Sequence, residues 1–252
     1  MIAFAWPYST DLEGRRVFGS HPEGYRLGIV HTDGTGLVEF PAIKEPRYFC
    51  WSADESKLAV YTYVHGTSGN KDRLIVLDLH SNQMEEIATV PAFLTQQCWS
   101  PDGRSLVYEI FARGDERKQV GSVAVYSLSD RTTKVLGPGV NPTWSADAAW
   151  IAFLQGDDYY VVHPDGTDKR VFLHAARPMT GLLWSPDGRY VAYGVCCKYS
   201  ITSALWRFYV RRLSDNAEDW VADINNIPHG DTVHWIQTGG LETRKNGDIH
   251  DK

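Results

Sequence analysis

Short runs of apolar and aromatic residues, separated by clusters of Gly, Pro, Asp, Asn and Ser, recur along almost the whole chain. Runs such as 105–110, 151–154 and 190–195 are rich in Val, Ile, Leu and Tyr and are too short for amphipathic helices. Apolar and polar residues alternate only in part, for instance over 73–79, which is typical of strands covered on both faces. The pattern predicts an all-β chain of short, buried strands.

A tryptophan recurs along this pattern, at positions 51, 99, 144, 184 and 235, in steps of 48, 45, 40 and 51 residues. The copies at 99–104 and 184–189 both read Trp-Ser-Pro-Asp-Gly-Arg. Those at 51 and 144 keep Trp-Ser and Asp, and the copy at 235 keeps little beyond the Trp and a Gly. Such a period indicates a repeat architecture, in which each unit is one small sheet.

The motif combines a large apolar wedge with a tight turn. Trp supplies rigid area that packs between neighbouring sheets, Pro fixes φ, Asp bonds the local backbone, and Gly accepts a positive φ cheaply. Glu55 and Ala148 stand where the full motif has Gly. There, either the turn type differs or roughly 1–2 kcal/mol of left-handed strain is tolerated. We expect these two turns to be looser than the others.

Each Trp motif ends the first of four strands in a repeat. The predicted strands are 48–51, 57–63, 73–79 and 85–90; 97–100, 105–110, 122–128 and 132–136; 142–145, 150–154, 159–163 and 170–173; and 182–185, 190–195, 206–213 and 218–221. The N-terminal repeat has only its last three strands, 2–5, 25–30 and 37–40, whereas 232–235 is a spare first strand. We expect these ends to pair, which closes a ring of five repeats without exposed sheet edges.

At this point the chain resembles the TolB-type β-propeller repeats, relatives of the WD-repeat propellers, whose signature is Trp-Ser-Pro-Asp-Gly-(Lys/Arg) followed by an apolar strand. The resemblance implies a β-propeller, and the repeats of this chain predict five blades, closed by pairing of the C-terminal strand with the N-terminal blade. We expect residues 1–240 to form this single domain and 241–252 to be a polar, disordered tail. That family includes periplasmic scaffold proteins, peptidase-associated propellers and some lyases, so the resemblance leaves function open.

Charge and composition narrow the function classes. The net charge of −6 and the pI near 5.8 argue against a nucleic-acid or anionic-membrane surface. The start of the chain, 1–6, lacks the features of a signal peptide, and no apolar run is long enough to span a membrane. We expect a soluble monomer, cytoplasmic as the chain is given, and periplasmic or secreted if a signal peptide was removed.

Two of the four cysteines, Cys50 and Cys98, stand directly before the motif Trp in successive repeats, and Cys196 and Cys197 end a strand. We expect them to be small buried hydrophobic residues rather than metal ligands or redox groups. The chain has no spaced Cys-x-x-Cys pair, which removes the usual zinc interpretation.

Loop lengths distinguish the two rims of the predicted propeller. The first-to-second and third-to-fourth turns share one rim and are short, whereas long, irregular loops crowd the other, which we therefore predict to be the functional face. The residues there that we predict to contact a ligand or partner are Arg16, His21, Arg47, His65, Lys71, Arg113, Arg177, His229 and Asp231.

Two function classes remain. The first is a non-enzymatic scaffold that binds a protein or peptide through this rim and the central funnel, with Arg and aromatic anchors. The alternative is a hydrolase or lyase acting on carbohydrate, with a divalent metal held by His21, His65, His229 and Asp231, although no cofactor is demanded by their spacing. Glycosidase chemistry requires paired carboxylates, and the inner strands before each Trp carry no Asp or Glu. No Gly-x-Ser-x-Gly elbow supports a serine hydrolase.

Overall fold

A computed structural model describes residues 1–7, 25–64, 71–89, 92–93, 98–111, 121–174, 181–199 and 204–225. Throughout these ranges the chain forms strands, turns and bends, without a helix. The all-β prediction is therefore confirmed for the described residues.

The strands form five antiparallel sheets, which we number in chain order. Sheet 1 contains β1 (Ile2–Pro7), β2 (Tyr25–Val30) and β3 (Val38–Lys44). Sheet 2 contains β4 (Pro46–Trp51), β5 (Lys57–Val64), β6 (Lys71–Asp78) and β7 (Gln83–Ala88). Sheet 3 contains β8 (Ala92–Phe93), β9 (Ser105–Ile110), β10 (Ser122–Ser127) and β11 (Thr132–Pro138).

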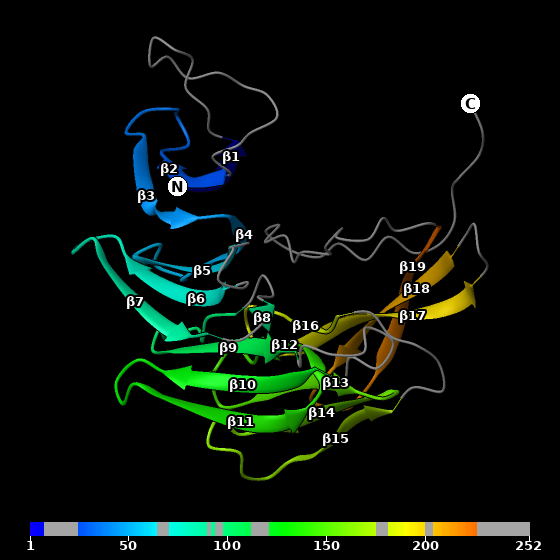
Figure 1. Ribbon diagram of the computed structural model, residues 1–252. Coiled ribbons are helices and arrows are strands. Elements are labelled where there is room, and N and C mark those ends of the chain that lie inside the picture. Colours follow the sequence, from blue (N-terminus) through cyan, green and yellow to red (C-terminus); the bar gives the residue numbers. More distant parts are fainter. Residues whose placement is uncertain are drawn as a thin grey trace, which may run out of the picture.

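Sheets 4 and 5 complete the series with the same up-and-down order. Sheet 4 contains β12 (Val140–Trp144), β13 (Ile151–Gln155), β14 (Asp158–Val162) and β15 (Arg170–His174). Sheet 5 contains β16 (Leu183–Trp184), β17 (Tyr190–Tyr199), β18 (Ala204–Arg212) and β19 (Glu218–Asn225). Figure 1 shows the sheets following one another from the blue N-terminal sheet to the orange C-terminal strands.

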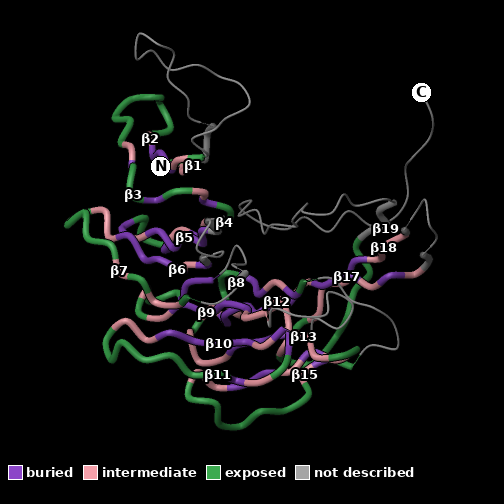
Figure 2. The backbone as a smooth tube through the Cα atoms, viewed as in Figure 1, coloured by how far each residue is buried: buried purple, intermediate pink, exposed green. Residues whose placement is uncertain are grey.

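The hydrophobic core is divided among the boundaries between consecutive sheets. One buried cluster lies between sheets 1 and 2, one between 2 and 3, one between 3 and 4, and one between 4 and 5. On β5, Leu58 and Val60 face sheet 1, whereas Ala59 and Tyr61 face sheet 3. Both faces of the strand are thus covered, which explains why the sequence alternates so weakly. Figure 2 shows the buried middle strands and the exposed outer strands β7, β11 and β15.

The inner strand of sheet 3 departs from the prediction. We expected a strand over 97–100, but the paired residues are Ala92 and Phe93, which lie opposite Ile110 and Glu109. Trp99 makes only an isolated bridge to Leu106. The sequence signal of the motif marks the Trp and the turn after it, but it does not fix where the inner strand pairs.

Closure of the ring falls outside the described residues, because the segment 232–235 belongs to the undescribed range 226–252. The number of blades in a closed ring, the single domain over 1–240 and the tail over 241–252 therefore stay predictions.

Candidate functional site

The turns that follow the motif tryptophans share one hydrogen-bond pattern in sheets 2 to 5. In sheet 4, Ser145 Oγ donates to Asp147 Oδ1 at 2.5 Å, and the backbone N–H of Trp150 donates to Ser145 Oγ at 2.9 Å. The backbone N–H of Ala149 also donates to Asp147 Oδ1, at 3.0 Å. The equivalent Ser–Asp bonds are Ser52–Asp54, Ser100–Asp102 and Ser185–Asp187. The Ser–Asp pair therefore organises each of these turns.

The turns without Gly are not looser than the others, contrary to the prediction. Glu55 and Ala148 adopt φ values of 55° and 59°, close to the 68° of Gly103 and the 67° of Gly188. Their backbone N–H groups also donate to the carbonyl oxygen of the turn Ser, as those of the glycines do. Of the two outcomes that the sequence left open, the chain tolerates left-handed strain, because the Ser–Asp bonds hold the turn in place.

The motif tryptophans also connect each sheet to the one before it. Trp99 Nε1 donates to the carbonyl oxygen of Cys50 at 2.9 Å, and Trp144 Nε1 donates to that of Cys98 at 3.1 Å. Trp184 breaks this series, because its Nε1 is buried without a hydrogen-bond partner in the described part of the chain. The indole itself is 9% exposed. The indole N–H is therefore hydrogen-bonded in Trp99 and Trp144 but has no partner within the described ranges in Trp184, at the boundary between sheets 4 and 5.

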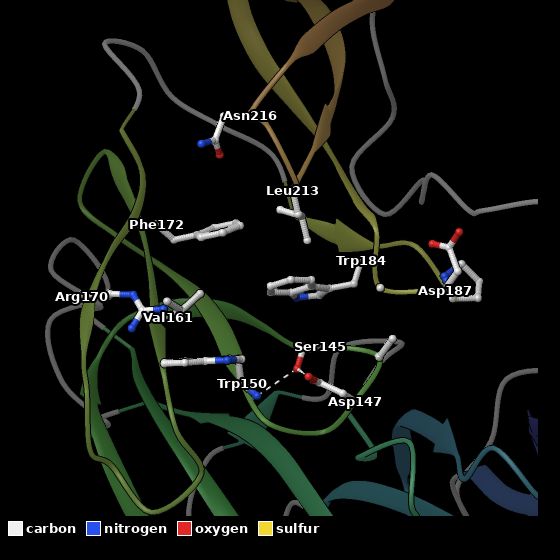
Figure 3. Close-up of a pocket in the computed structure, with 13 residues that line it drawn as sticks. Ser145, Asp147, Trp150, Val161, Arg170, Phe172, Trp184, Asp187, Leu213 and Asn216 are labelled. Atoms are coloured by element: carbon white, nitrogen blue, oxygen red, sulfur yellow. Dashed lines mark hydrogen bonds between the residues drawn. The ribbon is translucent and has the colours of Figure 1, made fainter. Parts of the chain in front are cut away.

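A cleft of about 520 Å³ lies at that same boundary and opens at the rim of the short turns. Its walls are the sheet 4 turn up to Trp150, the strands β14, β15 and β16, the sheet 5 turn and the β18–β19 turn, as drawn in Figure 3. The residues that line it are Ser145, Ala146, Asp147, Trp150, Val161, Arg170, Phe172, Trp184, Pro186, Asp187, Gly188, Leu213 and Asn216.

The rings of Trp150, Phe172 and Trp184 line this cleft. Phe172 stacks on Trp184 with ring centroids 5.5 Å apart, and Trp150 stacks on His163 at 3.8 Å. The guanidinium carbon of Arg170 lies 4.2 Å from the Trp150 ring, within the range of a cation–π contact. Figure 3 places Arg170 on one side of the cleft and both aspartates on the other.

The two carboxylates of the cleft are held as anions by their turns. The Ser145 hydroxyl, with the backbone N–H of Ala149, keeps the pKa of Asp147 below its usual range. The Ser185 hydroxyl, the backbone N–H of Arg189 and its guanidinium lower the pKa of Asp187 to about 2. Because hydrogen bonds to the charged form favour it, neither group carries a proton near neutral pH.

A disulfide joins Cys50 to Cys98, with the Cα atoms 6.2 Å apart. The prediction that these residues are simple buried hydrophobic side chains is wrong for this pair, which links the sheet 2 and sheet 3 inner segments. Both occupy the same place in successive repeats, so stacking of the sheets brings them together. Cys196 and Cys197 keep their thiol groups, the first buried and the second half-buried.

One further titratable group, Glu109, was not predicted from the sequence. Its carboxyl accepts a hydrogen bond from the backbone N–H of Asn141 at 2.6 Å, and its side chain is 3% exposed. Burial raises the pKa of Glu109 to about 7. The expectation about carboxylates concerned the first strand of each repeat, whereas Glu109 lies on β9, the second strand of sheet 3. A lone charge within the apolar run 105–110 was the signal that could have found it.

Few of the predicted contact residues can be placed. Arg47 lies on β4 and forms an exposed ion pair with Glu45 at 3.4 Å, and Lys71 begins β6 opposite Val64. The predicted residues outside the described ranges are Arg16, His21, His65, Arg113, Arg177, His229 and Asp231. The proposed long-loop face and its metal cluster are therefore untested.

Within the described ranges, His, Cys, Asp and Glu nowhere gather in threes in a way that could hold a metal ion. The same ranges contain no helix of the length and apolar character needed to cross a membrane.

No protein-family model matches the chain. Dipeptidyl-peptidase 5 from Porphyromonas endodontalis aligns over 103 residues at 31% identity, which covers 37% of this chain and 15% of that protein. The chain thus spans less than a sixth of the curated relative that it matches.

Solved structures match over far more of the chain. A putative TolB from Agrobacterium tumefaciens superposes with a TM-score of 0.57 at 16% identity, over 88% of this chain and 81% of that one. Oligogalacturonate lyase from Vibrio parahaemolyticus superposes with a TM-score of 0.57 at 17% identity, over 85% of this chain and 60% of that one. TolB from Acinetobacter baumannii superposes with a TM-score of 0.52 at 17% identity, over 79% of this chain. The match covers 49%, about half, of that protein. The predicted resemblance is confirmed at the level of the fold.

Proposed function

We propose that this chain, which has a TolB-type β-propeller fold, is a binding module that holds a protein or peptide in the cleft between sheets 4 and 5. The observation that carries the proposal is the coincidence of an aromatic-lined cleft with an unpaired, buried indole N–H on Trp184. Mostly apolar pockets with a few placed polar groups are typical of ligand sites, and about 300–1,000 Å³ is their usual range.

The chemistry of the cleft favours binding over proton transfer. A carboxyl group that acts as a general acid at neutral pH needs a raised pKa, whereas the pKa values of Asp147 and Asp187 are lowered. In addition, the Oδ1 atoms of both aspartates already accept hydrogen bonds within their turns. The rings of Trp150, Phe172 and Trp184 offer large, rigid contact area, which is typical of binding hot spots.

The partner in this proposal is a protein or peptide rather than nucleic acid or membrane, because the chain is acidic. The long-loop rim, with Arg47 and Lys71 at its described edge, stays a second proposed contact surface. We propose that the chain works as a monomer.

The Cys50–Cys98 disulfide supports a location in an oxidising compartment rather than in the reducing cytosol, because disulfides persist in oxidising compartments. This part of the proposal replaces the expectation of a cytoplasmic protein. Alkylation of the unreduced, exported protein should label Cys197 and leave Cys50 and Cys98 unmodified. Labelling of the latter pair would contradict it.

The binding proposal is tested by selecting displayed random peptides on the purified protein and titrating an enriched peptide by calorimetry. Ala146→Trp, which fills the cleft from the sheet 4 turn, should weaken binding roughly tenfold or more. Ala53→Trp, at the same place in the sheet 2 turn, is the matched control and should bind as the parent does. Equal binding by both variants would contradict the cleft, and recovery of no saturable peptide would contradict the binding module.

A second candidate, an enzyme acting on carbohydrate, is favoured by Glu109, whose pKa of about 7 suits proton transfer. Oligogalacturonate is a suitable first substrate, tested after EDTA treatment and again with manganese, with ultraviolet absorbance of unsaturated products as the readout. Activity that Glu109→Gln removes would support this candidate. Absence of product under both conditions would contradict it.

A further inference from the structure

One side of the cleft carries the guanidinium group of Arg170, which is ordered by an aromatic ring and pairs with no carboxylate among the described residues. The Arg170 guanidinium rests over Trp150 at 4.2 Å, and within the described residues it has no hydrogen bond or ion pair. A planar guanidinium that is already ordered by stacking loses less freedom when it binds a carboxylate through two parallel hydrogen bonds. This side of the cleft therefore suits a carboxylate.

The position of Arg170 relative to the apolar wall limits which carboxylate fits. Arg170 and Phe172 are separated by one residue on β15, and both line the cleft. β15 is irregular there, because Tyr160 pairs with Val171 and Tyr159 with Leu173, yet both Arg170 and Phe172 line the cleft. A terminal carboxylate and the side chain of the same residue are attached to one Cα atom, so a single C-terminal residue can offer one group to Arg170 and the other to the apolar wall.

The aspartates orient such a ligand. Asp147 and Asp187 lie across the cleft from Arg170 in Figure 3 and are ionised. Like charges repel, so the acidic end turns toward Arg170 and away from these turns. Toward Asp147, whose Oδ2 atom accepts none of the turn hydrogen bonds, the ligand offers backbone N–H groups instead. Trp184 lines the cleft, but its Nε1 atom is buried, so the ring offers the ligand apolar surface.

We propose that the cleft binds the C-terminal residue of a peptide, with its carboxylate on Arg170 and a large apolar side chain packed against the wall formed by Phe172, Trp184 and Leu213. This inference rests on the proposed binding function and specifies its ligand class.

The test compares pools of N-acetylated pentapeptides by calorimetry on the intact chain. One pool ends in Phe with a free carboxylate, a second ends in Phe amide, and a third ends in Ala with a free carboxylate. The first pool should bind, and removing either feature should weaken binding roughly tenfold or more. Arg170→Gln should make the acid and amide pools bind equally, whereas Arg104→Gln, an exposed Arg of the sheet 3 turn, should preserve the preference.

The outcomes separate the two proposals. If displayed internal peptides bind in the cleft but the free carboxylate gives no advantage, the C-terminal assignment is wrong and the binding function stands. If neither the pools nor displayed peptides bind, both are wrong. If 3-phenylpropionate binds as tightly as the first pool, the ligand is a small aromatic acid, which overturns the peptide assignment.

Discussion

The boundary between sheets 2 and 3 and the boundary between sheets 4 and 5 are made from the same repeat, yet they are joined differently. At the first, a disulfide and the indole hydrogen bond of Trp99 link the inner segments. At the second, the Trp184 Nε1 atom has no partner in the described part of the chain, and a cleft opens between the sheets beside the short turns. The motif therefore builds the sheets, whereas the residues around it decide whether a boundary is closed or open to a ligand.

The largest expected effect comes from breaking the closed boundary. The disulfide joins residues 48 positions apart, and the chain-entropy model gives about 4 kcal/mol for a loop of that length. Urea unfolding of Cys50→Ala/Cys98→Ala should show a loss of this size. Cys197→Ser, which keeps the disulfide, should unfold close to the parent, and an unchanged midpoint in the double variant would refute the role of the disulfide.

The boundary between sheets 3 and 4 sharpens the comparison, because Glu109 is buried there. Its folded pKa of about 7 exceeds the ordinary 4.5, so its contribution to stability is complete below pH 4.5 and is lost as pH rises through 7. Glu109→Gln should therefore raise the free energy of unfolding at pH 8, on the order of 3 kcal/mol, and change little at pH 4.5. A gain of the same size at both pH values would contradict this assignment.

The indoles provide a direct comparison of a closed with an open boundary. Trp99→Phe removes the indole hydrogen bond to the Cys50 carbonyl, whereas Trp184→Phe removes a buried donor that had no partner in the described part of the chain. Both lose similar ring area, so Trp99→Phe should cost about 2 kcal/mol more in unfolding free energy. Denaturant titrations under oxidising conditions measure the difference, and equal costs would show that the Trp99 bond contributes nothing net.

The smallest effect concerns the turns, which are alike at both boundaries. Ala148→Gly should stabilise the chain by about 1 kcal/mol, because it removes left-handed strain at a φ of 59°. Gly103→Ala should cost a similar amount, since an added Cβ there has no heavy atom within 4 Å and only strain remains. Thermal unfolding checks both, and an unchanged midpoint in both variants would mean that the Ser–Asp bonds cancel the strain.

The sequence predicted the sheets well because their determinants are local. The turn after each Trp is set by Ser and Asp within a few residues, and the strand that follows is an apolar run. The weak alternation of 73–79 correctly indicated strands covered on both faces, as the neighbouring clusters show.

The candidate site could not be predicted in the same way, because it depends on differences between equivalent positions. Trp99, Trp144 and Trp184 share one motif, and only the stacking of the sheets shows which indole lacks an acceptor. The disulfide between Cys50 and Cys98 could in principle be predicted from the sequence, because equivalent positions in successive repeats lie next to each other when the sheets stack. Loop length predicted a functional face on the opposite rim, whereas the cleft lies beside the short turns.

The Ser–Asp bonds of the turns separate folding from recognition. Since Ser and Asp fix the backbone, the residues between and after them are free to vary, as Pro, Ala, Gly and Glu already do. In sheets 4 and 5 these variable positions are Ala146, Pro186 and Gly188, and they line the cleft. A combinatorial library confined to them would redesign selectivity on an unaltered framework, which makes this pair of turns a natural starting point for engineered binders.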